Sequence, residues 1–274
     1  MKIVADSSCD MAILPGVKFS VVPLIISADE REFVDGEDLN VDEMLTFIEN
    51  YKGRTGTACP SIQGFLDAFE DETELFVVTM TGSLSGTYGS ACAARDQYIQ
   101  EHPGRKVYVV DSKSTGPGER LLIEKLSELI EEGISFDEIC TRIEDYKAKN
   151  HLFFGLKSID NLAKSGRVNK LIASAVGLLG ISILGTASKE GTIEPVGKSR
   201  GDVRLVRDTF KEMKAAGYRG GKVRINNVLN VEIADALKHA IIAEYPNADV
   251  LCYPAYGLNS FYAERYGFIL GCEC

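Results

Sequence analysis

Short apolar runs alternate with longer amphipathic stretches over the first 150 residues of the chain. The runs are bounded by polar or glycine-containing turns, which is the pattern of buried strands. They lie at 2–5, 19–27, 75–80 and 106–110. Helices are predicted between them at about 41–51, 61–69, 84–100, 118–132 and 135–150. Strands that alternate with helices predict a mostly parallel sheet with helices on both faces.

The pattern changes after residue 150. The segments 181–187 and 193–198 are predicted to be strands joined by a polar, glycine-containing turn, which is typical of a hairpin. Further strands and helices are predicted at 152–156, 158–164, 168–179, 203–216, 222–226, 231–245, 250–253 and 268–272. We therefore expect an α/β protein of two domains, an N-terminal α/β domain (1–150) and a C-terminal α+β domain (151–274). The boundary is approximate, segments can exchange across it, and the ligand site is expected between the domains.

Charge and composition narrow the class of protein. The 274 residues include 30 basic and 40 acidic side chains, giving a net charge of −10 without a basic run. Nucleic acids and anionic membrane surfaces are therefore disfavoured as partners. The longest apolar stretch, 171–186, is too short for an integral membrane segment, and the chain starts with an apolar strand rather than a leader. Seven cysteines without a Cys-x-x-Cys pair favour reduced thiols and a cytoplasmic location.

The strongest candidate for a binding site is the segment 76–91, which predicts a strand, a hydroxyl-rich turn and the first turn of a helix. The first N–H groups of a helix lack an intrahelical partner, and the helix dipole places partial positive charge there. Hydroxyls and glycines in the turn add donors and allow close approach to the backbone. The residues concerned are Gly82, Ser83, Ser85, Gly86 and Thr87. This pattern predicts a cradle for an anionic or strongly hydrogen-bond-accepting group.

Three more polar clusters border predicted strands and helices. They are Asp6 with Ser7 and Ser8, Thr57 with Ser61 in a predicted loop at 53–61, and Asp111 with Ser112. Each cluster alone is most often a helix N-cap. At the carboxyl ends of neighbouring parallel strands, however, they would line one crevice. Hydroxyls and amides without a general base or a metal bind well but catalyse poorly, which favours a binding protein over an enzyme.

Nucleotide, metal and thiol chemistry have weak support in the sequence. The motif Gly-x-Gly-x-x-Gly is absent, and the segment 191–199 has one residue too many between its glycines to be a phosphate-binding loop. The three histidines are far apart and lack the spacing of metal ligands. Cys9 and Cys59 have no evident base partner. We expect no metal, no cofactor and no catalytic residue.

Six segments in order resemble the DegV family, bacterial fatty-acid-binding proteins of two α/β domains. They are Ala-Asp-Ser-Ser (5–8), Thr-Ala-Cys-Pro-Ser (57–61), Leu-Ser-Gly-Thr-Tyr with Ser-Ala (84–91), Val-Asp-Ser (110–112), Asn-Leu-Ala-Lys-Ser-Gly-Arg-Val (161–168) and Lys-Ser-Arg-Gly (198–201). The resemblance runs essentially end to end. It implies a long-chain fatty acid, such as palmitate or stearate, as the ligand.

The resemblance also implies roles for single residues. Thr57 and Ser85 match the family residues that hold the fatty acid carboxylate, and the Gly86 and Thr87 amides would assist them. The acyl chain would lie in an apolar tunnel between the domains. The segments 168–179 and 181–187 are candidates for its wall, although they would serve equally well as ordinary core. The remaining candidate ligand contacts are Asp6, Ser7, Ser61 and Ser83.

Some family members present the fatty acid to a separate kinase subunit, which phosphorylates the carboxylate. Arg167 and Arg200 match family arginines near the head group or the partner surface. In the kinase-associated subset, a His-x-Gly-Pro-Gly segment near the C-terminus helps to engage the kinase. This chain has Asn-Ser-Phe-Tyr-Ala-Glu at 259–264 and no histidine there. It therefore resembles a branch of the family without that segment. Whether a fatty acid kinase subunit is its partner stays open at this point.

Three functions are therefore considered. The first is a non-catalytic fatty acid carrier. The second is an enzyme that acts on a small carboxylated or phosphorylated metabolite in the same crevice, with Asp6 or Asp111 as its base. The third is the partner subunit of a lipid kinase.

Overall fold

The computed structural model describes residues 1–168 and 180–274. The helix predicted at 168–179 lies outside the described residues, apart from Val168. Within the described ranges, no helix combines the length and the apolar character needed to cross a bilayer.

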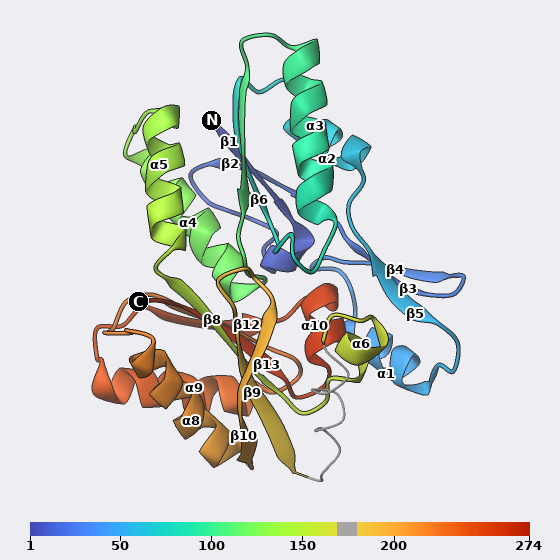
Figure 1. The fold of residues 1–274 in the computed structure, drawn as a ribbon, viewed down its shortest axis with the longest axis vertical. Helices are drawn as coiled ribbons and strands as arrows, with labels where there is room; N and C mark the ends of the chain where they lie inside the picture. Colours follow the sequence, from blue (N-terminus) through green and yellow to red (C-terminus); the bar gives the residue numbers. More distant parts are fainter. Residues whose placement is uncertain (169–179) are drawn as a thin grey trace.

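The N-terminal part forms a parallel sheet between two layers of helices, as the sequence predicts (Figure 1). The elements are β1 (Lys2–Asp6), β2 (Lys18–Val22), β6 (Glu74–Thr79), β7 (Lys106–Asp111), α2 (Ile62–Phe69), α3 (Thr87–Glu101), α4 (Pro117–Glu131) and α5 (Phe136–Lys147). The strand order is β2-β1-β6-β7, and every pairing is parallel. α2 and α3 cover one face, whereas α4 and α5 cover the other.

β1 shows why these strands are continuous apolar runs. All five of its residues are buried. Ile3 and Ala5 pack toward α4 and α5, while Val4 packs toward α2 and α3. A strand covered on both faces has no solvent side, so the usual alternation of apolar and polar residues is lost. The parallel arrangement also brings Asp6, Thr79 and Asp111, the last residues of three neighbouring strands, to one edge.

The C-terminal part forms a six-stranded sheet of order β10-β9-β8-β13-β11-β12. Its strands are β8 (Asn150–Leu156), β9 (Ile181–Ala187), β10 (Ile193–Arg200), β11 (Val223–Asn227), β12 (Val250–Pro254) and β13 (Phe268–Glu273). All pairings are antiparallel except that of β11 with β12. The predicted hairpin is confirmed as β9 and β10.

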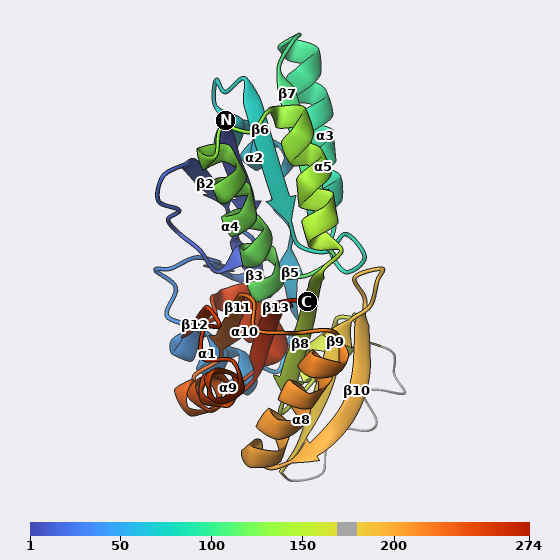
Figure 2. The same cartoon turned by 90° about the vertical axis from the view of Figure 1, so that its left-hand side faces the viewer.

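Helices pack on both faces of this second sheet. They are α6 (Asp160–Lys164), α8 (Asp202–Ala215), α9 (Val231–Glu244) and α10 (Gly257–Ala263). α8 and α9 cover one face, and α6 and α10 lie on the other. Figure 2 shows the parallel sheet above the six-stranded sheet, with β6 directed toward it. The carboxyl-end edge of the first sheet therefore faces the second sheet.

A third sheet corrects two local predictions. It contains β3 (Ile25–Ala28), β4 (Arg31–Val34) and β5 (Thr55–Ala58) in the order β4-β3-β5. The single strand predicted at 19–27 is wrong, because Pro23, which lacks an N–H group, separates β2 from β3 and the two join different sheets. The loop predicted at 53–61 is wrong in part, because β5 lies within it and pairs with β3.

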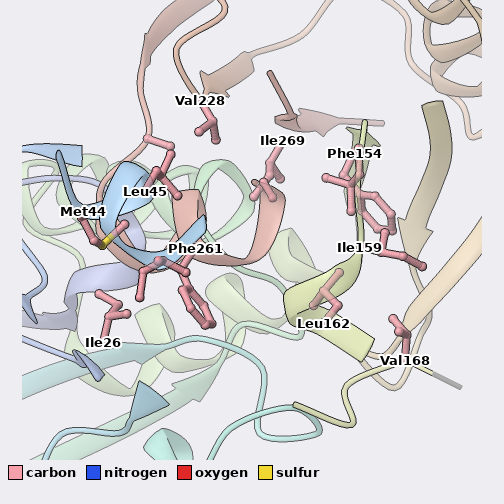
Figure 3. Packing of buried hydrophobic residues seen from close by; sticks show 14 of the residues in the cluster. Ile26, Met44, Leu45, Phe154, Ile159, Leu162, Val168, Val228, Phe261 and Ile269 are labelled. Atoms are coloured by element: carbon pink, nitrogen blue, oxygen red, sulfur yellow. The ribbon is translucent and has the colours of Figure 1, made fainter. Parts of the chain in front are cut away.

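An apolar cluster joins this third sheet to the C-terminal part (Figure 3). Ile26 of β3 and Met44 of α1 (Val41–Asn50) belong to the same cluster as Phe154 of β8 and Phe261 of α10. Figure 3 shows Ile26 and Met44 on one side of the cluster and Phe154 on the other, with Phe261 between them. Residues 25–58 therefore pack on the six-stranded sheet. The division into domains near residue 150 stays a prediction.

Met44 tests how strongly this cluster holds the fold together. Its side chain has no exposed surface. We expect Met44→Ala to lower the free energy of unfolding by roughly 2–5 kcal/mol, because it removes buried methylenes and leaves a cavity. Urea denaturation followed by circular dichroism measures the change. Val203→Ala on α8, at a side chain that is 89% exposed, is the control and should change stability by less than about 0.5 kcal/mol. Equal stability of the two variants would contradict the role of the cluster.

Candidate functional site

A cavity of about 100 Å³ lies between the edge of the parallel sheet and the six-stranded sheet. Leu152, Phe154 and Leu156 of β8 form its apolar floor. Its walls are the turn after β6, the loop after β7, α10 and the tip of the β9–β10 hairpin. The volume is several times the space that one water molecule requires. A hollow with an apolar floor and polar loops at its rim suits a ligand with an apolar body and a polar end.

The charged groups on the cavity wall are cations. Lys113 and Arg167 line it, and the described residues of the lining include no carboxylate. Lys113 is paired with Asp111 at 2.7 Å, so part of its charge is balanced. The Arg167 guanidinium donates to the backbone carbonyls of Ser165 at 2.9 Å and Leu84 at 3.4 Å. Arg167 therefore has no carboxylate partner among these contacts, and its charge favours an anionic group at that end of the cavity.

The predicted strand–turn–helix junction is present. β6 ends at Thr79 and α3 begins at Thr87, three residues later than the sequence predicts. The Ser85 hydroxyl lies 2.8 Å from the Thr87 hydroxyl and accepts a hydrogen bond from the Thr87 amide at 3.3 Å. Gly86 occupies the N-cap position and has no side chain with which to satisfy the helix amides. The positive end of the α3 dipole therefore stays available beside Ser85.

Thr57, Ser85, Gly86 and Thr87 are not part of the cavity lining, but Thr57 and Ser85 adjoin residues that are. The Thr57 hydroxyl lies 2.8 Å from the Tyr262 hydroxyl. The guanidinium carbon of Arg167 lies 5.9 Å from the centre of the Tyr262 ring, and Arg167 donates to Leu84 next to Ser85. Leu84, Arg167 and Tyr262 all line the cavity. The two hydroxyls that the resemblance pairs are thus connected through residues of the cavity wall.

The start of α3 and the end of β5 meet at Gly86, at the open end (the mouth) of the cavity. A Cβ atom on Gly86 would lie 3.2 Å from the sulfur of Cys59, which follows β5 directly. Cys59 also lies 3.8 Å from the hydroxyl of Ser90 on α3. The absence of a side chain at residue 86 therefore lets β5 and its Thr57 approach the start of α3.

Two of the predicted contacts, Ser83 and Ser61, have structural partners instead. Ser83 donates to the backbone carbonyl of Glu190 in the hairpin tip. Ser61 is the N-cap of α2 and accepts from the Gly64 amide at 3.0 Å. A hydroxyl has one proton to donate, so Ser83 cannot also donate to a carboxylate while it holds the hairpin. Ser61 only accepts in its contact and keeps its proton, so its role as a ligand contact stays a prediction.

Asp6 and Ser7 are fully buried and do not line the cavity. Asp6 accepts from the Met80 amide at 2.8 Å, and Ser7 donates to Asp35 at 2.7 Å and accepts from the Leu24 amide at 2.9 Å. These contacts fasten the start of the chain to the turn after β6 and to the third sheet. Asp6 and Ser7 therefore hold the turn after β6 in place, and a direct contact with a ligand stays a prediction for both.

A cluster of buried carboxyl groups surrounds this segment. Burial raises the pKa of Asp6 and of Asp10 to about 6 and that of Asp35 to about 7, and it raises the pKa of Glu119 well above its usual range. The Ser8 hydroxyl lies 2.6 Å from both Asp6 and Glu119, although it has only one proton. Glu119 is therefore protonated and donates to Ser8, which donates to Asp6.

Neither carboxylate considered as a base is free to act in the cavity. Asp6 is held by Ser8 and Met80, as described. Asp111 accepts from the Gly82 and Lys113 amides at 3.1 Å and pairs with the Lys113 ammonium. Arg200, at the end of β10, is exposed and is not part of the lining. The two family-matched arginines thus lie in different places, Arg167 on the cavity wall and Arg200 on the surface.

Several residues of the cavity wall were not predicted from the sequence. They are Lys113, Ser114, Thr115, Thr192, Asn259 and Tyr262. The Ser114 hydroxyl is buried and has no hydrogen-bond partner among the described residues. Asn259 and Tyr262 lie in the segment where the chain departs from the kinase-associated subset, and that departure was the one signal that pointed to them. The others come from loops whose meeting depends on the packing of the two sheets.

The fold and the cavity together define an α/β protein with a buried apolar cavity between a parallel and a mostly antiparallel sheet. A family model described as "Uncharacterised protein, DegV family" matches residues 1–256. A DegV domain-containing protein from Streptococcus pneumoniae is 41% identical over 276 residues, which cover 99% of this chain and 98% of the relative. The chain therefore belongs to the DegV family.

Two solved structures are similar to this chain along its length. A DegV family protein from Eubacterium eligens, loaded with heptadecanoic acid, has a TM-score of 0.97 at 51% identity and covers 99% of both chains. The fatty acid kinase (Fak) B3 protein of Streptococcus pneumoniae, loaded with linoleic acid, has a TM-score of 0.97 at 40% identity. The match covers 99% of this chain and 98% of the Fak B3 protein.

The buried carboxyl cluster predicts how stability depends on pH. The pKa of Asp35 is about 7 in the folded protein, above its ordinary value of 3.8, so the folded state holds a proton that the unfolded state releases. The contribution of protonated Asp35 to the free energy of unfolding is complete below about pH 4 and is lost as the pH rises to about 7. Asp35→Asn stays neutral. We therefore expect its stability relative to the wild type to rise over this range by up to about 1.4 kcal/mol per pH unit.

Urea unfolding of both proteins at about pH 4.5, 6 and 8 measures the difference in their free energy of unfolding. Asp145→Asn on the exposed side of α5 is the matched control and should follow the wild type. A difference between Asp35→Asn and the wild type that stays constant with pH would contradict the assignment.

Proposed function

We propose that this protein binds a long-chain fatty acid in the cavity between its two sheets. The observation that carries the proposal is the apolar floor of β8 combined with a cationic, hydroxyl-bearing mouth, where Arg167 and Tyr262 line the cavity and Thr57 contacts the Tyr262 hydroxyl. The fatty acids in the Eubacterium eligens and Streptococcus pneumoniae structures support it, because both proteins share this fold closely.

The acyl chain supplies most of the binding free energy in this proposal. Each methylene removed from water contributes about 0.8 kcal/mol. A long chain therefore offsets the loss of translational and rotational freedom on association, which costs several kcal/mol. The head group then needs only to be hydrogen-bonded, because it contributes orientation more than affinity.

In this proposal the carboxylate lies at the mouth, near the start of α3 and the hydroxyl pairs Thr57–Tyr262 and Ser85–Thr87. In the pairs Thr57–Tyr262 and Ser85–Thr87, one hydroxyl donates to the other. Each pair therefore has one hydroxyl proton left, and both protons can be donated to a carboxylate. The positive end of the α3 dipole and the Arg167 charge add to this attraction. The mouth thus replaces the hydration of the carboxylate without a metal or a general base.

Mass spectrometry of freshly purified, denatured protein tests the proposal directly. We expect a long-chain fatty acid in about equimolar amount with the protein. Delipidated protein should rebind palmitate or stearate. If no acyl species is found and the delipidated protein binds neither fatty acid, the proposed function is wrong.

Two substitutions test the head-group site. Thr57→Val and Ser85→Ala each remove a hydroxyl, and each should weaken palmitate binding by roughly 1–3 kcal/mol, about 5- to 150-fold. Thr141→Val repeats the same change on the exposed side of α5, and we expect it to bind palmitate as the wild type does. Isothermal titration of delipidated protein measures the affinities. Unchanged affinity of Thr57→Val and Ser85→Ala would remove these hydroxyls from the site.

We further infer that the protein presents its fatty acid to a separate kinase and has no catalytic step of its own. The 40% identity to the Fak B3 protein over 99% of the chain favours this function over simple storage. The carboxylate position at a cavity mouth supports it, because a partner can reach the head group there. A cytoplasmic location fits this function, since the seven cysteines are free thiols.

Reconstitution separates presentation from catalysis and from storage. Palmitate-loaded protein with ATP and a purified bacterial fatty acid kinase subunit should form acyl phosphate, and neither protein alone should do so. Arg200→Ala should reduce the yield without changing palmitate affinity, because Arg200 is exposed and lies outside the cavity. Acyl phosphate from the protein alone would establish the enzyme alternative. No acyl phosphate in the mixture, with the Fak B3 protein active as a control, would leave a carrier.

A further inference from the structure

Three neighbouring strands place one residue each in a row across the cavity floor. Gly185 of β9 lies opposite Phe154 of β8, and Phe154 lies opposite Ile269 of β13. Phe154 and Ile269 line the cavity. Side chains alternate between the faces of a strand, so a side chain at residue 185 would project from the same face. Gly185 is thus the one position in this row without a side chain.

The Phe154 ring occupies the place that this side chain would take. A Cβ atom on Gly185 would lie 2.3 Å from both Cε2 and Cζ of the ring. The two atoms are at the far end of the ring, so the ring leans from β8 across the backbone of β9. The cavity above the row is open because the Phe154 ring packs on Gly185 and does not project into it.

Among the described residues, the neighbours of the ring close every direction except the one toward the cavity. Leu152 and Leu156 flank Phe154 on its own strand, and Ile269 stands on the other neighbouring strand. Figure 3 shows Phe154 and Ile269 side by side on this face of the sheet. The opposite face is filled by the core under α8 and α9. A displaced ring therefore enters the cavity.

We propose that the pair Phe154–Gly185 determines how much of a straight acyl chain the cavity holds. This inference rests on the proposed function and adds to it the two residues that set chain-length specificity. Gly185 seats the ring and admits a long saturated chain. A side chain at residue 185 shortens the chain that fits, and truncation of Phe154 lengthens it.

A double-mutant cycle tests the coupling between the two residues. The ratio of the affinities for stearic and lauric acids is measured by titration of delipidated protein. Gly185→Ala should lower this ratio about tenfold, because fewer methylenes find room. Phe154→Ala should raise it. In Gly185→Ala/Phe154→Ala the ratio should return to at least that of the wild type, because the displaced ring is gone.

The cycle also removes the effect of a second contact. A Cβ atom at residue 185 would lie 2.8 Å from the backbone oxygen of Glu194, so Gly185→Ala strains β10 as well. That strain is common to the single and the double variant and does not depend on the ring. Gly197→Ala on β10 is the control, because its Cβ would meet nothing within 4 Å. A lowered ratio that persists in the double variant, or an unchanged ratio in all variants, would overturn the proposal.

Xenon separates a failure of this inference from a failure of the proposed function. Xenon enters apolar cavities regardless of any fatty acid, and its occupancy is measured in pressurised crystals of delipidated protein. Occupancy should fall in Gly185→Ala and rise in Phe154→Ala. If the wild type binds no fatty acid but xenon follows this order, the proposed function is wrong and the control of the cavity by the pair stands. Equal occupancy in all variants would overturn the inference.

Discussion

The hydrogen bonds of the buried carboxyl groups hold the cavity in shape. Asp6 accepts from the Met80 amide, Asp10 from the Tyr256 amide at 2.8 Å, and Asp35 from the Leu258 amide at 3.1 Å. The first contact fixes the turn before α3, and the other two fix the start of α10. The turn before α3 and the start of α10 are the two sides of the mouth. Both therefore depend on carboxyl groups from residues 6–35.

Such a network gives a precision that apolar packing alone does not provide. Apolar contacts are non-directional, whereas a carboxylate oxygen and an amide meet at a defined distance and angle. Asn226 extends the network, because it donates to Asp10 at 2.6 Å and accepts from the Ile269 amide at 3.0 Å. Ile269 belongs to the cavity floor. The floor and both sides of the mouth are therefore held by buried polar side chains, namely Asp6, Asp10, Asp35 and Asn226.

The sequence could predict the elements but only part of the site. The hairpin at 181–198 and the parallel strands follow from local patterns, because periodicity and turn residues are local properties. β5 could not be predicted, since its Thr-Gly-Thr-Ala sequence has little strand character and the strand forms by pairing with β3. Asp6 and Ser7 have the appearance of ligand contacts at a strand end. Only the packing of β4 and α4 around them shows that their partners are Asp35 and, through Ser8, Glu119.

Tyr262 shows the same limit from the other direction. Nothing near it in the sequence points to Thr57, yet their hydroxyls are in contact because α10 packs against β3, the strand with which β5 pairs. A contact between residues that are far apart in the sequence can be recognised only when the tertiary structure is known.

The packing of α1 against α10 has a consequence for synthesis of the protein. α1 is complete once the first 50 residues have been made, but its Met44 and Leu45 pack against Phe261 and Ala263. Arg265 then binds Asp42 and Glu49 of the same helix at 2.6 and 2.7 Å. Domains generally fold from the N-terminus while the ribosome is still translating. Here β3 and β4 can cover only part of the apolar side of α1, and the rest stays uncovered until α10 has left the ribosome. During this interval the exposed apolar surface makes the nascent protein prone to aggregation.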